Sequence, residues 1–286
     1  MKNYSAILCI ALVCLLGCSS QEQKKTKMDA SIPCILFECT QPFFSCVTDK
    51  GCRSKLDCTK ECDKIADPEQ RQLCMTECTA VNPNRKFLDL AASMAKNGCI
   101  TPPEYDCPLP RNRAQLAPLT LTQLEGDWWV IRGLSKAYDC FSCQKMAFNR
   151  VSETVSTYDY TYMPGKSGNV IDAIKCTITA IPYSPAETAV CPGRFRINYN
   201  AYGMEGADNV FVLSHPSPDY LLLYYCGQTP SDKYRGSIVI SRSPETPIPA
   251  DIEKELNKAL AAAGLPAPLT LKDYGIPDNS TCIGKQ

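Results

Sequence analysis

Eight short segments rich in β-branched and aromatic residues dominate the second half of the chain, and no helical pattern separates them. Segments of this kind form strands, and turn signals such as the run from Pro164 to Gly168 lie between them. The segments are residues 128–132, 145–151, 156–163, 169–181, 194–202, 209–214, 220–226 and 236–241. This series predicts a mainly β fold, a small eight-stranded up-and-down barrel.

One clear helical pattern follows the strands, over residues 250–263. Ile252, Leu256 and Ala259 or Leu260 share one face of this helix, and Gly264 ends it. We expect the helix to pack on the outside of the barrel, within a domain of residues 120–286. A proline-rich linker, residues 108–119, precedes that domain.

Cysteines are the main feature of the first half of the chain. The whole sequence contains 19 cysteines but a single histidine, His215. Ten lie between Cys34 and Cys107, and this density predicts a disulfide-stapled module over residues 34–107. Two CxxxC spacings, Cys58 to Cys62 and Cys74 to Cys78, each place two sulfurs on one helix face. Two such helices folded antiparallel would form the disulfides Cys62–Cys74 and Cys58–Cys78.

The same nested pairing, applied upstream, predicts the disulfides Cys39–Cys46 and Cys34–Cys52. We interpret these bonds as structural rather than as a source of catalytic thiols. The Cys140-Phe-Ser-Cys143 segment could in principle be a redox or zinc motif. It lacks a thioredoxin-like helix or a second pair of ligands, so we predict no metal.

The N-terminus carries a short apolar run, residues 4–17, behind Lys2. The run is shorter than the roughly 20 residues that span a bilayer, and it is typical of a signal peptide. We expect a signal over residues 1–20 and a polar tether over residues 21–33. The ending Leu-Leu-Gly-Cys18 resembles a bacterial lipobox, so an acylated Cys18 would anchor the chain to a lipid bilayer; a secretory signal cut near Ser20 is the alternative.

Either processing route removes Cys9, Cys14 and Cys18 from pairing, which leaves 16 of the 19 cysteines. An even number in an oxidising compartment predicts up to eight disulfides. The protein is therefore expected to be extracytoplasmic. The charge balance argues against a nucleic-acid partner. The sequence has 30 basic and 30 acidic residues, whereas a nucleic-acid-binding protein usually has a basic face.

Three marks of the lipocalin barrel occur in order along the chain: Gly126-Asp-Trp128, then Pro218-Asp219-Tyr220, then Arg242 at the end of the last strand. In lipocalins, which this barrel resembles, the arginine lies across the tryptophan at the closed end, a cation–π contact of about 1 kcal/mol. The sequence thus predicts a lipocalin-like barrel whose first strand begins at the closed end.

Strand direction then places a candidate site at the open end. The first strand ends there, before Asp139, and the alternating strands bring Asp208, Tyr225, Asp232 and Tyr234 to the same mouth. If Asp208 and Tyr225 face inward, the period of two sends an apolar set inward with them. That set, Val210, Val212, Leu221 and Leu223, would bind an apolar ligand or would simply fill the core.

More specifically, residues 34–284 or so resemble the violaxanthin de-epoxidase family. The resemblance rests on the spacing of the N-terminal cysteines, the CxxxC hairpin and four further motifs. These motifs are Tyr138-Asp-Cys-Phe-Ser-Cys-Gln144, Pro218-Asp-Tyr-Leu-Leu-Leu-Tyr-Tyr225, Ile238-Val-Ile-Ser-Arg-Ser243 and Asn279-Ser-Thr-Cys282. It implies the disulfides Cys143–Cys282 and Cys99–Cys107. For the four remaining cysteines we expect Cys140–Cys226 and Cys176–Cys191.

The resemblance also implies an oxidoreductase that removes the epoxide oxygen of a xanthophyll or a similar apolar epoxide, with ascorbate as reductant. It implies acid–base roles for Asp208 and Tyr225 and further acidic site positions at Asp139 and Asp232. An epoxide oxygen leaves readily only when it is protonated, so the reaction needs an acid that keeps its proton. A carboxyl at the rim of a dry barrel has its pKa raised, and a nearby tyrosine can relay the proton.

The sequence departs from the family pattern at four positions. Ser142 replaces a second acid, Met146 and Asn149 replace two histidines, and Ile240 replaces a tyrosine. These losses keep an alternative open, a non-catalytic lipocalin-type lipoprotein that binds an apolar ligand at the cell envelope. A purely disulfide-held interaction module is a third possibility. A thylakoid lumen or secreted location is likewise an alternative to a membrane-anchored lipoprotein.

Overall fold

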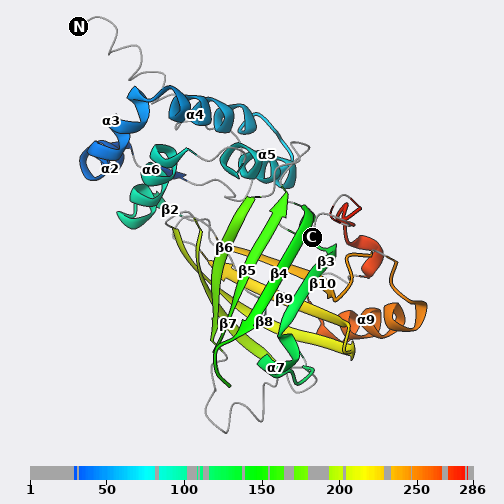
Figure 1. Ribbon diagram of the computed structural model, residues 1–286. Helices are drawn as coiled ribbons and strands as arrows, with labels where there is room; N and C mark the ends of the chain where they lie inside the picture. Colours follow the sequence, from blue (N-terminus) through cyan, green and yellow to red (C-terminus); the bar gives the residue numbers. More distant parts are fainter. Residues whose placement is uncertain are drawn as a thin grey trace, which may run out of the picture. The chain divides into compact units, whose positions relative to one another are not determined.

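The protein forms two compact units, one mainly of residues 1–105 and the other mainly of residues 106–286 (Figure 1). The computed structural model describes residues 29–30, 32–80, 84–101, 108, 110–111, 116–136, 139–153, 155–163, 171–179, 193–201, 204–228, 233–245, 247–265, 270–280 and 282. The predicted signal with Cys18, most of the tether, Cys107, Cys191 and Asp232 lie outside these residues. Among the residues described, no helix combines the length and hydrophobicity needed to cross a membrane.

The first unit is helical. Its elements are β1 (Asp29–Ala30), α2 (Ile32–Glu38), α3 (Thr40–Thr48), α4 (Lys50–Cys62), α5 (Pro68–Ala80), α6 (Arg85–Lys96) and β2 (Ile100–Thr101). Two side chains start helices here: Asp49 accepts from the Cys52 amide at 2.8 Å, and Asn84 accepts from the Phe87 amide at 3.0 Å. A small core of cysteines and apolar side chains holds α2, α3 and α6 together, namely Ile35, Cys39, Phe43, Cys46, Cys52, Leu90 and Cys99.

Disulfides join these helices, and the CxxxC prediction is confirmed. Cys62–Cys74 and Cys58–Cys78 link α4 to α5. The upstream prediction is wrong, because the structure contains Cys46–Cys52 and Cys34–Cys99 in place of Cys39–Cys46, Cys34–Cys52 and Cys99–Cys107. The end of α3 and the start of α4 are separated only by Asp49, which brings Cys46 to Cys52, while the end of α6 brings Cys99 to α2.

The second unit is the predicted eight-stranded barrel. Its strands are β3 (Gly126–Gly133), β4 (Ser142–Arg150), β5 (Val155–Met163), β6 (Ile171–Thr179), β7 (Arg194–Ala201), β8 (Met204–Ser217), β9 (Tyr220–Gln228) and β10 (Lys233–Ser241). They close in the order β10-β3-β4-β5-β6-β7-β8-β9. Sequence neighbours therefore pair around the wall, as an up-and-down barrel requires.

Alternate residues of each strand face the inside and the outside of this wall. Trp128 and Val130 belong to the inner cluster with Val212, Leu221 and Ile240. Their neighbours Trp129 and Ile131 belong to an outer cluster, which also contains side chains of α9 (Ala250–Ala263). The helix lies alongside the barrel wall, as expected from its apolar face, and Gly264 ends it at φ 57° (Figure 1).

The closed end carries the lipocalin marks. The Arg242 guanidinium lies 3.9 Å from the centre of the Trp128 ring, which is fully buried. Arg242 also donates to the carbonyls of Gln123 at 2.9 Å and Glu125 at 2.7 Å, which lie at the end of the short helix α7 (Leu121–Leu124) and just after it. Gly126 begins β3 at φ 94°, and the Asp219 carbonyl before Tyr220 accepts from the Arg242 amide at 3.1 Å.

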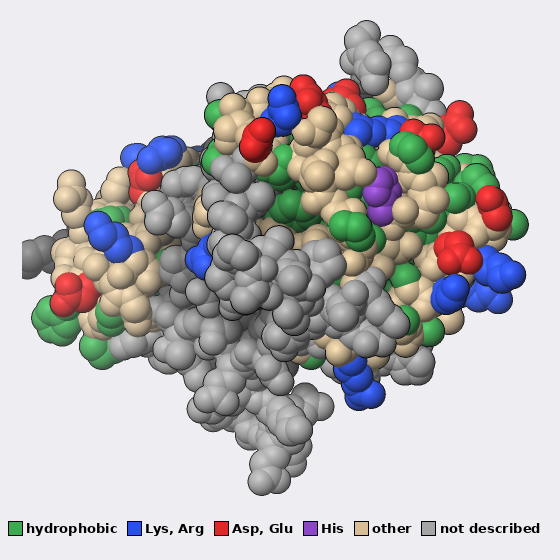
Figure 2. Space-filling view, turned by 90° about the horizontal axis from the view of Figure 1, so that it is seen from below, with side chains coloured by type: hydrophobic (Ala, Val, Ile, Leu, Met, Phe, Trp, Pro, Cys, Tyr) green, Lys and Arg blue, Asp and Glu red, His purple; other side chains and the backbone are tan. Residues whose placement is uncertain are grey.

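A disulfide links the C-terminal tail to the start of β4. The predicted Cys143–Cys282 disulfide is present, and the Asn279 side chain hydrogen-bonds the backbone of both β4 and β3. Asn279 Oδ1 accepts from the Cys143 amide at 3.1 Å, while Nδ2 donates to the Val130 carbonyl at 2.9 Å. On the face that Figure 2 shows, acidic and basic side chains are interspersed rather than gathered into a patch of one sign.

Candidate functional site

The open end of the barrel gathers a set of acids and tyrosines. Asp139 comes from the loop after β3, Asp208 from β8, Tyr225 from β9 and Tyr234 from β10. The sequence prediction named all four of these residues for this mouth. The structure brings them together as two hydrogen-bonded pairs that share an aromatic contact.

Asp139 forms the first pair with Tyr225. The loop fixes the carboxyl, since the Ser135 amide donates to Asp139 Oδ2 at 3.0 Å and the Asp139 amide donates to the Ser135 carbonyl at 2.7 Å. The Tyr225 hydroxyl donates to Asp139 Oδ1 at 2.5 Å. Burial, and then the neighbouring charge of Asp139, raise the pKa of Tyr225 well above its usual value. Tyr225 therefore keeps its proton and serves as a donor.

Asp208 forms the second pair with Tyr234. The Tyr234 hydroxyl donates to Asp208 Oδ1 at 2.5 Å. Burial raises the pKa of Asp208 to about 6, although the hydrogen bond from Tyr234 lowers it. The pKa of Tyr234 is raised, first by burial and then by the charge of Asp208. Asp208 is thus a carboxyl at the mouth that holds a proton in mildly acidic solution.

Further aromatic side chains extend the site, and sequence reasoning missed them. The Tyr199 hydroxyl, from β7, hydrogen-bonds that of Tyr234. The rings of Tyr225 and Tyr234 meet edge to face with centroids 6.2 Å apart, which joins the two pairs. Gln144 hydrogen-bonds the Tyr160 hydroxyl, and Phe141 stacks on Tyr162 at 4.9 Å. The sequence does contain a signal for this aromatic lining. Tyrosines alternate with other residues along the segment 156–163, at Tyr158, Tyr160 and Tyr162.

Glycines make room for these rings. Gly227 lies opposite Asp208 in the β8–β9 register, and a Cβ there would overlap both the Asp208 carboxyl and the Tyr234 ring. A Cβ at Gly236 would overlap the Tyr225 ring, and one at Gly206 would overlap Tyr199. Each of these strand glycines is thus explained by the close approach of a site side chain.

The predicted apolar set lies beneath the mouth. Val210, Val212, Leu221 and Leu223 are all buried and share the inner cluster with Trp128, and Tyr225 packs against it. The positions that depart from the family pattern separate into two kinds. Met146 and Ile240 are buried in this same inner cluster, whereas Asn149 is exposed and Ser142 begins β4.

The single histidine does not belong to the site. His215 lies towards the end of β8 opposite to Asp208, and its pKa is lowered by burial and by the charge of Arg242. Arg242 is the residue that covers Trp128 at the closed end. A titrating histidine is therefore not among the described groups at the mouth.

Cysteines give two further observations. The Cys140 sulfur donates to the Gly133 carbonyl at 3.5 Å, and the disulfide of Cys226 is formed with a different cysteine, so the predicted Cys140–Cys226 bond is wrong. The Cys176–Cys191 prediction lies outside the described side chains. The sulfurs of Cys62, Cys74 and Cys78 lie within 4.8 Å of one another, but all three are in disulfides and offer no thiolate to a metal.

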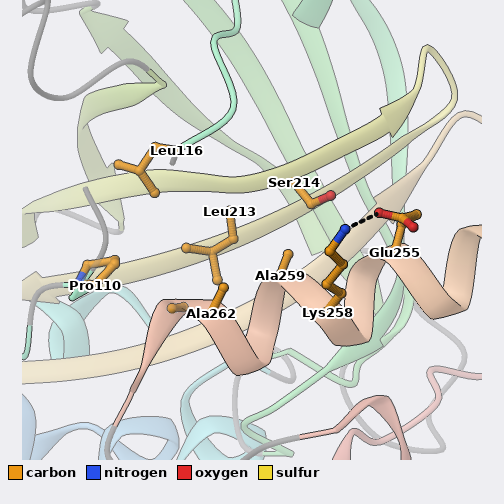
Figure 3. A pocket seen from close by; sticks show the side chains of 9 residues that line it. Pro110, Leu116, Leu213, Ser214, Glu255, Lys258, Ala259 and Ala262 are labelled. Carbon is orange, nitrogen blue, oxygen red and sulfur yellow. Dashed lines mark ion pairs between the residues drawn. The ribbon is translucent and has the colours of Figure 1, made fainter. Parts of the chain in front are cut away.

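A pocket of about 180 Å³ lies away from the mouth, between α9 and the outer face of β8 (Figure 3). Apolar side chains including Leu213, Leu116 and Ala259 line it, and the Lys258–Glu255 ion pair borders it. It contains none of the predicted site residues, and it belongs to the seam where the helix packs on the barrel.

Comparison with known proteins points to one family. The family model described as the VDE lipocalin domain matches residues 31–279. Violaxanthin de-epoxidase of Spinacia oleracea is 24% identical over 263 residues, covering 87% of this chain and 51% of that protein. The Arabidopsis thaliana protein of the same name is 24% identical over 280 residues, covering 92% of this chain and 57% of that protein. The chain thus spans about half the length of the curated relatives it matches.

Two solved structures of low sequence identity match part of the chain. Lobster apocrustacyanin A1 is 14% identical, with a TM-score of 0.41, covering 55% of this chain and 78% of that one. Insecticyanin from the tobacco hornworm Manduca sexta is 11% identical, with a TM-score of 0.44, covering 62% of this chain and 87% of that one.

Proposed function

Because this chain belongs to the VDE lipocalin domain family, we propose that it is a violaxanthin de-epoxidase-like oxidoreductase. Its substrate would be a xanthophyll epoxide or a similar apolar epoxide. The observation that carries the proposal is Asp208, a carboxyl with a pKa raised to about 6 at the mouth of an apolar barrel. A carboxyl with a raised pKa keeps its proton and can donate it to an epoxide oxygen, whereas a solvent-exposed carboxyl would be ionised at the same pH.

The reaction balances as a two-electron reduction. The epoxide oxygen leaves as water, taking two protons, and the carbon–carbon double bond forms in its place. Ascorbate, the reductant carried over from the family resemblance, loses two electrons and two protons to become dehydroascorbate. The chain itself has to supply the first proton and to keep the epoxide oriented at the mouth.

Asp208 is the residue we propose as that acid. Tyr234 donates to its Oδ1, so the carboxyl is held in one orientation, and Tyr199 holds Tyr234 in turn. Tyr225 remains neutral, and its one hydroxyl proton is donated to Asp139, so it would donate to the substrate oxygen as that oxygen gains charge only by exchanging this bond. The buried set Val210, Val212, Leu221 and Leu223 would receive the apolar part of the substrate.

The test is turnover of violaxanthin with ascorbate by the oxidised protein, compared between wild type and Asp208→Asn. We expect Asp208→Asn to lose at least about 100-fold in rate, as loss of a general acid typically does, while carotenoid binding persists. Asp159→Asn is the matched control, because Asp159 lies between the inward Tyr158 and Tyr160 and so faces the outer side of β5. Equal rates for the two variants would refute the assignment.

One observation favours a second candidate, a lipocalin that binds an apolar ligand without converting it. Met146 and Ile240 stand where the family pattern has polar groups, and both are buried in the inner cluster. The same assay separates the two candidates. A stable red-shifted complex with no conversion at any pH would support the carrier.

The location we propose is extracytoplasmic. Five disulfides among the described residues support an oxidising compartment, and the curated relatives carry the name "chloroplastic". Anchoring to a lipid bilayer through an acylated Cys18 is a proposal from the sequence. Mass spectrometry of the mature N-terminus tests it, since acylation would add fatty-acyl mass to Cys18.

A further inference from the structure

A chain of three hydrogen-bonded side chains crosses the inner wall at the mouth of the barrel. Tyr234 of β10 donates to Asp208 Oδ1 of β8 at 2.5 Å, and the Tyr199 hydroxyl of β7 hydrogen-bonds the Tyr234 hydroxyl. A tyrosine hydroxyl has one proton, and that of Tyr234 is donated to Asp208. Tyr199 is therefore the donor in the second bond, so both bonds point from Tyr199 towards the carboxyl.

Two glycines let this chain reach across neighbouring strands. β9 lies between β8 and β10 in the barrel, and a Cβ at Gly227 of β9 would overlap both the Tyr234 ring and the Asp208 carboxyl. A Cβ at Gly206 of β8 would likewise overlap the ring and the hydroxyl of Tyr199. The rings thus lie directly against backbone, which is what brings hydroxyls from β7 and β10 to a carboxyl on β8.

The two ends of the chain differ in their access to water. Tyr199 lies two residues before the end of β7 at the mouth and is partly exposed. In the proposed function, the substrate lies over the Asp208 carboxyl and separates it from solvent. The tyrosine on β9, Tyr225, donates its one proton to Asp139. Among the described side chains, Tyr234 is the one that donates to Asp208.

We propose that Tyr199 and Tyr234 form a proton relay that returns a proton from solvent to Asp208 after each turnover. The inference rests on the proposed function, in which Asp208 gives its proton to the epoxide oxygen. Tyr234 then gives its hydroxyl proton to the Asp208 carboxylate and takes that of Tyr199, which takes one from water. Rotation of the carboxyl and of the two hydroxyls restores the starting arrangement. One proton leaves with the substrate oxygen and one enters from solvent, so the relay needs neither oxidant nor reductant.

The surroundings of Tyr234 favour a concerted transfer. Burial, and then the charge of Asp208, raise the pKa of Tyr234, so a free tyrosinate is disfavoured. The other titratable groups that face this pair are Tyr225 from β9, whose ring meets that of Tyr234, and Asp139 behind it. A negative charge from Asp139 disfavours a tyrosinate further. Each hydroxyl must therefore receive a proton as it gives one away, and this requires the direct contact between hydroxyls that the structure contains.

The first test compares one turnover with many, using violaxanthin and ascorbate. The protein is equilibrated at about pH 5, below the pKa of about 6 of Asp208, so that most molecules start with the acid form. Tyr199→Phe keeps the ring and removes the hydroxyl. We expect it to convert the first epoxide at about the wild-type rate but to lose about tenfold or more in steady-state rate, at unchanged KM. Formate or imidazole should restore the steady-state rate, because a small acid can carry the missing proton.

Tyr224→Phe is the control, because Tyr224 lies in the outer cluster and donates to the Pro108 carbonyl. Equal steady-state rates for Tyr199→Phe and wild type would overturn the relay and leave the proposed function standing. A first turnover slowed as much as the later ones would also overturn it, since Tyr199 would then only hold the site in shape.

A second measurement follows the carboxyl without turnover. Zeaxanthin, a xanthophyll without an epoxide, occupies the barrel, and infrared difference spectroscopy records protonation of Asp208 after a jump to about pH 5. Asp208→Asn identifies the carboxyl band. Protonation should be slower in Tyr199→Phe than in wild type and Tyr224→Phe, and equal rates would contradict the relay. A wild-type protein that neither binds nor converts a carotenoid would overturn the proposed function, and the relay with it.

Discussion

The Tyr225 hydroxyl donates a hydrogen bond of 2.5 Å to Asp139, a residue 86 positions earlier in the chain. The carboxyl is buried, and its other oxygen accepts from the Ser135 amide. The bond therefore links the loop after β3 to β9 across the mouth of the barrel. It also gives Tyr225 a single orientation beside the Asp208–Tyr234 pair, with which its ring makes an edge contact.

We expect Tyr225→Phe to lower both turnover and stability. Removing the hydroxyl takes a donor from the buried carboxyl of Asp139, which costs about 1–3 kcal/mol of unfolding free energy. A double-mutant cycle with Asp139→Asn measures the coupling by denaturant unfolding. The double variant should lose less than the sum of the two single variants, and strict additivity would show that the pair does not interact in solution.

Turnover should fall as the pH rises through about 6. The acid form of Asp208 is the reactive one in the proposed function, and its pKa is raised to about 6. Above that pH, the rate should decline about tenfold for each pH unit, because each unit leaves about one tenth of the acid form. A profile that is flat between pH 5 and about 8 would exclude Asp208 as the acid.

Tyr234→Phe should move this decline to higher pH. The Tyr234 hydroxyl donates to the Asp208 carboxylate and so favours its charged form. Without that bond, the pKa of Asp208 rises further. Tyr224→Phe is the control, because Tyr224 lies in the outer cluster and donates to the Pro108 carbonyl instead. Identical pH profiles for Tyr234→Phe and wild type would contradict the geometry.

The free energy of unfolding should fall as the pH rises from about 4 to about 6, because the pKa of Asp208 is raised in the folded state. The folded-state pKa of Asp208 lies above its unfolded value of 3.8, so the folded state binds more protons in this window. Folding therefore loses free energy as the pH rises through it. Thermal melts of Asp208→Asn against wild type isolate this contribution. The difference between the two melting curves should change with pH inside the window and be constant above pH 7.

Gly227→Ala should abolish turnover while the barrel still folds. The added Cβ would overlap Asp208 and Tyr234, so their hydrogen bond would have to break. Steric displacement of this kind typically costs about 1–3 kcal/mol of stability. Circular dichroism and the violaxanthin assay measure the two effects separately, and a fully active variant would show that the pair is not needed in this arrangement.

Arg242→Ala should destabilise the barrel by about 2 kcal/mol without changing the pH profile of turnover. It removes the cation over Trp128 and the hydrogen bonds to the carbonyls of Gln123 and Glu125, all at the closed end. Lys145→Ala is the matched control, since Lys145 lies 5.4 Å from the neighbouring Trp129 ring on the outer face. We expect a smaller loss of stability for Lys145→Ala, and the reverse order would refute the lipocalin-type role of Arg242.

Local spacing was sufficient to predict the architecture. Alternation along the strands fixes which side chains share a face, so the inward set under Tyr225 and the outer position of α9 followed from the sequence. Two cysteines four residues apart on a helix lie on the same face of that helix in any fold. Two such helices packed antiparallel can therefore pair their cysteines in a predictable order, which gives Cys58–Cys78 and Cys62–Cys74. Strand direction likewise brought Asp139, Asp208 and Tyr225 to one end.

The tertiary structure alone decided which of these groups meet. Cys34 pairs with Cys99 because α6 returns to α2, and no local spacing contains that return. The registers between strands distant in the sequence likewise determine which side chains at the mouth form hydrogen bonds. The resulting pairs are Tyr199 with Tyr234, Tyr225 with Asp139, and Tyr234 with Asp208. A register depends on every bulge and pairing around the closed wall, whereas the face of a residue depends only on its place in its own strand.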